Sequence, residues 1–159
     1  MGKQNILKLA VCILISELAG LLGSVFTLPS ISAWYSTLNK PFFTPPNWFF
    51  GPVWTSLFLL MGISLFLVWK KGFRNKKLKI GITFFSIQLA LNVSWSILFF
   101  GLHKPFYAMV EISVLWVFIL LTAIQFKKID KKAAYLLIPY LVWVAFAGFL
   151  NYSIWIMNI

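Results

Sequence analysis

The sequence predicts an all-α integral membrane protein, a five-transmembrane-helix bundle with a long lid-like loop between helices 1 and 2. Of its 159 residues, 61% are hydrophobic and only 11% are charged, which excludes an ordinary soluble domain. Five apolar segments each approach or exceed the roughly 20 residues that span a bilayer. Apart from the first, the connections between these segments are short. One compact bundle is therefore expected.

The predicted spans cover about residues 9–28, 47–69, 80–102, 105–126 and 133–157, within a single domain of residues 1–159. The first span is not expected to be a cleaved signal peptide, because its apolar stretch is longer than a usual signal core and Glu17 interrupts it. Its residues Ser16, Gly20 and Ser24 recur at four-residue spacing, which allows another helix to approach closely. This span is expected to remain in the bundle.

The positions of the basic residues predict the topology. Of the 14 Lys and Arg residues, Lys40 and Lys104 lie in connections on one side of a five-span protein. The others precede the first span or lie between spans two and three and between spans four and five, all on the opposite side. By the positive-inside rule, the N-terminus is cytoplasmic and the C-terminus extracytoplasmic in a plasma membrane. The net charge of +11 is thus interpreted as a topology signal, with contact to anionic lipid as the alternative and nucleic acid disfavoured.

The connection between the first two spans, about residues 29–46, is the candidate lid. Pro41, Pro45 and Pro46 exclude a continuous helix before residue 47 and stiffen this loop. Long ordered loops in compact proteins usually serve a function, and this one carries several aromatic residues, including Trp34. The alternative is that these rings form an aromatic belt at the membrane interface.

Aromatic and polar side chains share one face in the second and third spans. Trp54 and Phe58 are four residues apart in the second span. The third span presents Gln88, Asn92, Trp95 and Phe99 on one face. Amides at this depth in a membrane need partners, so they either bond neighbouring helices or line a cavity.

The fourth and fifth spans carry further candidates. Tyr107 and Glu111 share a face of the fourth span, and structural pairing is expected for Glu111 as for Glu17. In the fifth span, Pro139 predicts a kink, and the face that follows it holds Trp143, Ala147 and Leu150. The small residue Ala147 serves either close helix packing or the accommodation of a flat ligand.

No conventional catalytic or metal-binding constellation is present in the sequence. His103, the single histidine, lies beside Lys104 without an acid or nucleophile nearby in the sequence, so it is either solvated or an axial ligand of a metal tetrapyrrole. The lone Cys12 forms no intrachain disulfide and provides no metal cluster. No metal site is predicted.

Several short motifs occur in the order and spacing of a known family. They are WY at 34–35, KP at 40–41, PP at 45–46, GPVW at 51–54, QLALN at 88–92, FFG at 99–101, PYL at 139–141, AFA at 145–147 and LNY at 150–152. In these motifs the chain resembles the tryptophan-rich sensory protein / translocator protein family, also called the peripheral-type benzodiazepine receptor family. The resemblance implies a five-helix membrane fold, often dimeric, with a pocket capped by the first loop. It also implies binding of porphyrins and benzodiazepine-type ligands, and in some members of sterols.

On this resemblance the chain is expected to be a homodimeric membrane receptor or carrier for a porphyrin such as protoporphyrin IX or heme, held as a ligand and not as a covalent cofactor. A porphyrin is a wide apolar plate with carboxylates on one edge, so it needs aromatic faces, a slot between helices and a cation, here Lys40 or Lys104. The candidate ligand-binding residues are Ser24, Trp34, Lys40, Trp54, Phe58, Asn92, Trp95, Phe99, Tyr107, Trp143, Ala147 and Leu150.

The chain departs from the family pattern at two places, and two alternative functions stay open. No basic residue follows Tyr152, so the cholesterol-recognition pattern is incomplete, and Tyr107 stands where many relatives carry Trp. One alternative is light-dependent breakdown of porphyrin, with Trp54 and Trp143 as candidate catalytic residues. The other is a lipid- or sterol-binding membrane protein. Transport, sensing and degradation of a ligand are not separated by the sequence.

Overall fold

The computed structural model describes residues 2–72 and 76–159, and over these ranges its regular structure is entirely helical. The helices are α1 (Lys3–Ala33), α2 (Asn47–Trp69), α3 (Lys76–Ser96), α4 (Pro105–Lys127), α5 (Lys131–Leu136) and α6 (Ile138–Met157). A 3-10 turn, Tyr35–Thr37, follows α1, and a π-helical turn, Ile97–Gly101, extends α3. Within the described residues, five spans are long and apolar enough to cross a membrane, the last formed by α5 and α6 together. The predicted fold class is confirmed.

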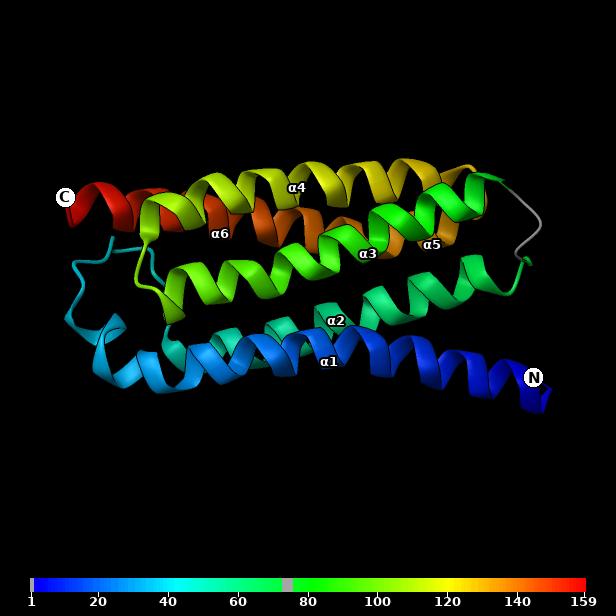
Figure 1. The fold of residues 1–159 in the computed structure, drawn as a ribbon, viewed down its shortest axis with the longest axis horizontal. Helices are drawn as coiled ribbons and strands as arrows, with labels where there is room; N and C mark the ends of the chain where they lie inside the picture. The colour runs from blue at the N-terminus through cyan, green and yellow to red at the C-terminus, as the bar shows by residue number, and fades with distance from the viewer. Residues whose placement is uncertain (1, 73–75) are drawn as a thin grey trace.

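The long helices run side by side along the long axis of the molecule (Figure 1). Helix α1 packs against α2 and α3, α4 packs against α3 and α6, and the short α5 packs against α2 and α4. The N-terminus and the C-terminal ends of α2 and α4 lie at one end of the bundle, which we call the basic end because the lysines of these segments gather there (Figure 1). The loop after α1 and the C-terminus lie at the other end, called the loop end (Figure 1).

Helix α1 is longer than the span predicted from hydropathy, because it continues through Pro29 to Ala33. Pro29 removes one backbone donor, but the next turn is held from outside the helix. The Ser30 hydroxyl donates to the carbonyl of Phe100 at 2.6 Å, and the backbone N–H of Trp34 donates to the carbonyl of Ser30 at 3.0 Å. The candidate lid, expected at about residues 29–46, is therefore the shorter loop of residues 34–46.

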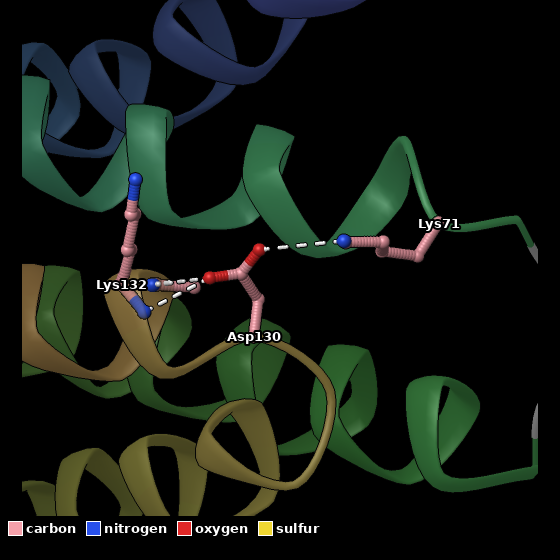
Figure 2. A network of polar contacts seen from close by, with 4 residues as sticks. Lys71, Asp130 and Lys132 are labelled. Carbon is pink, nitrogen blue, oxygen red and sulfur yellow. Dashed lines mark hydrogen bonds and ion pairs between the residues drawn. The ribbon is translucent and has the colours of Figure 1, made fainter.

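The last span is interrupted where Pro139 predicted a kink, since α5 ends at Leu136 and α6 begins at Ile138. Asp130 caps α5: its Oδ1 accepts hydrogen bonds from the backbone N–H of Lys132 at 2.9 Å and of Ala133 at 3.4 Å. Its Oδ2 lies 3.8 Å from Nζ of Lys71, just beyond the end of α2 (Figure 2). Cap and ion pair together fasten α5 to α2 at the basic end.

Helices α1 and α2 approach each other closely at Gly62. A Cβ atom there would lie 2.6 Å from Cα of Ile13, so only glycine fits without moving the backbone. Nearer the loop end, the two helices contribute residues to opposite walls of a cavity, from Glu17 onward in α1 and from Asn47 to Phe58 in α2.

Candidate ligand-binding site

A cavity of about 550 Å³ lies at the loop end of the bundle, between α1, α2, α3 and α6. This volume is within the range of about 300–1,000 Å³ typical of sites for small molecules. Most of its lining is apolar or aromatic. The cavity is thus suited to a largely apolar ligand that binds between the helices.

A row of aromatic rings forms one wall. Trp54 of α2 stacks on Phe58 with ring centroids 5.8 Å apart, and its ring centroid lies 6.4 Å from that of Trp95 in α3, with the planes 30° apart. Trp95 in turn stacks on Phe99 at 5.3 Å and 20°. Each helix supplies its pair of rings through four-residue spacing, and the π-helical turn from Ile97 carries Phe99. These nearly parallel faces suit a flat ligand.

Hydrogen bonds behind the rings fix this wall. Nε1 of Trp95 donates to Oδ1 of Asn151 at 3.0 Å, and Nδ2 of Asn151 donates to the carbonyl of Pro105 at 2.9 Å. Asn92, which lines the cavity, donates through Nδ2 to the hydroxyl of Tyr140 at 2.8 Å, and that hydroxyl donates to Oε1 of Gln88 at 3.0 Å. Gln88 thus serves helix packing, whereas Asn92 both packs and lines the cavity.

The part of the cavity wall that α1 and α2 contribute reaches the exposed surface of the bundle. Leu21 and Leu28 of α1 line it and are exposed, as are Trp48, Gly51 and Thr55 of α2. A Cβ atom added at Gly51 would meet nothing within 4 Å, so this stretch of the wall is unfilled. The ends of the loop reach the cavity through Tyr35 and Asn47.

The structure brings most of the predicted site residues to this cavity. Those in its wall are Ser24, Trp54, Phe58, Asn92, Trp95, Phe99, Ala147 and Leu150. The other four, Trp34, Lys40, Tyr107 and Trp143, lie outside the wall.

Trp34 and Lys40 shape the loop end. The Trp34 ring stacks on His103 at 4.3 Å and contacts the edge of Phe99 at 5.4 Å. Nζ of Lys40 donates to the carbonyls of Tyr35 at 2.7 Å and Leu38 at 3.0 Å, and lies 4.9 Å from the centroid of the Tyr35 ring. In this conformation the Lys40 ammonium is engaged by the loop's own backbone. Burial raises the pKa of Tyr35 to about 12, so this ring stays neutral at physiological pH.

Trp143 and Tyr107 lie away from the cavity for different reasons. Trp143 packs against Phe49, Phe50 and Phe146, and of these Phe50 lines the cavity, so Trp143 stands in a second layer of rings. Its Nε1 is buried and has no hydrogen-bond partner in the described part of the chain. Tyr107 is 60% exposed and contacts Phe106.

Glu17 and Glu111 lie within membrane spans, and the structural pairing expected for their carboxylates is not formed among the described residues. Within residues 2–72 and 76–159, no hydrogen bond or ion pair is formed by Glu17, which lines the cavity. Both carboxylate oxygens of Glu111 are buried, and they too lack a partner among these residues. Sequence reasoning missed the place of Glu17 although a signal was present, since Glu17, Gly20 and Ser24 follow helical spacing along one face.

His103 is not part of a recognisable metal centre. Its Nε2 lies 3.4 Å from the Ser30 hydroxyl, and its backbone adopts the left-handed conformation with φ of 53°. Among the described residues, no group of three or more His, Cys, Asp or Glu side chains could hold a metal ion. Its stacking on Trp34 indicates a structural contact at the loop end.

Comparisons with known proteins agree with this architecture. The model of the TspO/MBR family matches residues 12–156. Tryptophan-rich protein TspO of Chlorobaculum tepidum is 46% identical over 99% of both chains, and that of Archaeoglobus fulgidus is 47% identical over 98% of this chain and 99% of its own. Translocator protein of Bos taurus is 37% identical over 89% of this chain and 85% of its own.

Proposed function

The chain belongs to the TspO/MBR family, and on that premise we propose that it is a membrane receptor or carrier that binds a porphyrin in the cavity between its helices. The family includes relatives named translocator protein and tryptophan-rich sensory protein. The ligand in this proposal is a protoporphyrin-type tetrapyrrole, such as protoporphyrin IX or heme, bound without a covalent link.

The observation that carries the proposal is the row of nearly parallel rings formed by Trp54, Trp95 and Phe99 in a cavity of about 550 Å³. Flat apolar molecules gain most from such faces, because ring stacking adds to the burial of apolar surface. Lys40 lies in the loop after α1 and Lys104 directly precedes α4, so both lie at the loop end, where the carboxylate edge of a porphyrin would remain solvated. For Lys40 to meet a carboxylate, its ammonium would exchange the loop carbonyls for the ligand.

Orientation and assembly are further parts of the proposal. The basic end faces the cytoplasm, which puts the loop end and the C-terminus outside, because lysines follow the positive-inside rule. The protein acts as a homodimer, as the family resemblance implies. Fusion of a reporter to the C-terminus tests the orientation, and mass determination in detergent tests the dimer.

The site is tested by filling the cavity. Ala147 is buried in its wall, so Ala147→Leu inserts three carbon atoms where the ring should lie. Overpacking of about 1–3 kcal/mol corresponds to a loss of affinity of roughly 5- to 150-fold. Ala145→Leu is the matched control, because Ala145 is exposed on the same helix. Titration with protoporphyrin IX in lipid nanodiscs measures both, and equal affinity of the two variants would place the site elsewhere.

Light-dependent breakdown of porphyrin is the second candidate function. The observation that favours it is that two oxidisable indoles, Trp54 and Trp95, stack within the cavity wall. A photoexcited ligand held against them could take an electron from either ring. This reaction would use the same bound complex, so the two candidates share the binding step.

A further inference from the structure

Glu17 places a carboxylate in the cavity wall, and a ligand that itself carries two carboxylates gives no reason for it. It is the first residue that α1 contributes to the wall, and Ile31 is the last, so Glu17 lies at the deep end, remote from the loop. A carboxylate inside a membrane span is costly, and such residues usually have a partner or a function. Within the described residues Glu17 has no hydrogen bond and no ion pair.

The wall around Glu17 offers it no cation, and several of the wall's donors are already used. No Lys, Arg or His is found among the described residues that line the cavity. The α1 hydroxyls are used by their own helix, since Ser24 donates to the carbonyl of Leu21 at 2.7 Å and Thr27 to that of Gly23 at 3.1 Å. Nδ2 of Asn92 donates to Tyr140. No described side chain donates to Glu17, so a ligand that enters the cavity can supply the missing donor.

We infer that Glu17 is a specificity-determining residue that accepts a hydrogen bond from a protonated amine or another N–H group of the ligand. The inference rests on the proposed function and deepens it: among flat apolar ligands, the cavity selects those that present a donor at the deep end. An anionic edge is repelled by Glu17 and points toward the loop end, where Lys40 and Lys104 lie. The ligand is thus bound in one orientation.

The experiment uses two probes with one ring system. The first is protoporphyrin IX, and the second is its derivative in which both carboxylates are converted to amides that end in primary amines. Affinities are measured in lipid nanodiscs for the full-length wild type, Glu17→Gln and Glu111→Gln. Glu111 is the matched control, because it is the other carboxylate within a span and lies outside the cavity wall. Thermal melting in detergent verifies that both variants fold.

We expect Glu17→Gln to weaken binding of the amine probe about tenfold or more, because an ion pair between ammonium and carboxylate becomes a hydrogen bond to a neutral amide. The same variant should bind protoporphyrin IX at least as tightly as the wild type does, and Glu111→Gln should bind both probes normally. Unchanged affinity of Glu17→Gln for the amine probe, or an equal loss for both probes, would overturn the role of Glu17.

Failure of the proposed function has a separate signature. A wild type that binds neither tetrapyrrole contradicts porphyrin binding and leaves Glu17 to be tested with a smaller pair of probes, 2-aminomethylnaphthalene and 2-naphthoic acid. Preference for the amine in the wild type, lost in Glu17→Gln, would support the inference with a different ligand. Equal binding of the two naphthalenes by both proteins would overturn it.

Discussion

The side-chain amide of Asn158, beyond the end of α6, pairs with both backbone groups of Asn39 in the loop. Oδ1 of Asn158 accepts from the N–H of Asn39 at 2.9 Å, and Nδ2 of Asn158 donates to the carbonyl of Asn39 at 2.9 Å. Nδ2 of Asn39 adds a bond to the carbonyl of Met157 at 3.3 Å. Residues far apart in the chain thus fasten the loop to the C-terminus at the cavity end of the bundle (Figure 1).

Asn158→Ala should release this loop. It removes three neutral hydrogen bonds at an exposed site, two to Asn39 and one to the carbonyl of Ile154, for a loss of stability of about 1 kcal/mol. The larger effect is local: backbone N–H groups of residues 37–44 should exchange with solvent faster, and a bound ligand should dissociate faster. Ser153→Ala is the control, because the Ser153 hydroxyl bonds only the carbonyl of Phe149 in its own helix. Equal exchange in the two variants would show that this pairing does not hold the loop.

Tyr140→Phe should destabilise the bundle more than its small change in size suggests. The Tyr140 hydroxyl accepts from Asn92 and donates to Gln88, and all three side chains are buried. Its removal leaves two buried amides short of a partner, at about 1–3 kcal/mol each. Unfolding in detergent measures the loss, with Tyr135→Phe as an exposed control. A Tyr140→Phe variant as stable as that control would contradict this role of the network.

Gly62→Ala should push α1 away from α2. The added Cβ would lie 2.6 Å from Cα of Ile13, and a backbone atom, unlike the tip of a side chain, cannot rotate aside. Overpacking of this kind costs about 1–3 kcal/mol. At Gly51 on the same helix, a Cβ meets nothing within 4 Å, so Gly51→Ala is the control. Melting temperatures in detergent compare the two, and equal values would mean that the helices separate without cost.

The sequence predicted the five spans because each is apolar over a membrane thickness, and helical spacing brought Trp54 and Phe58, like Trp95 and Phe99, to the cavity together. Helical spacing alone could not show which of Trp143 and Ala147 lies in the cavity wall. The two share a face of α6, but only tertiary packing shows that Phe50 comes between Trp143 and the cavity.

Hydrogen bonds between side chains and the backbone also could not be predicted from the sequence. Nothing in the pattern around Lys40 indicates that its ammonium bonds loop carbonyls. The loop was expected to begin at about residue 29, where the Ser30 hydroxyl in fact bonds the carbonyl of Phe100 and the helix continues. The partnerless state of Glu17 likewise depends on what the other helices fail to supply, which the span's own residues do not reveal.

Any light-dependent loss of porphyrin should depend on Trp54 and not on Trp143, because Trp54 lies in the cavity wall and Trp143 stands behind Phe50. Phe retains much of the apolar face but is far harder to oxidise than Trp, so Trp54→Phe should keep most of the dark affinity and lower the photochemical rate, with Trp95 as the remaining donor. Trp143→Phe should keep both. The measurement is the decay of porphyrin absorbance under illumination at matched occupancy, for wild type, each single variant and the double variant. A rate that falls in Trp143→Phe but not in Trp54→Phe would contradict this assignment, and an undiminished rate in the double variant would exclude both residues as the electron donor.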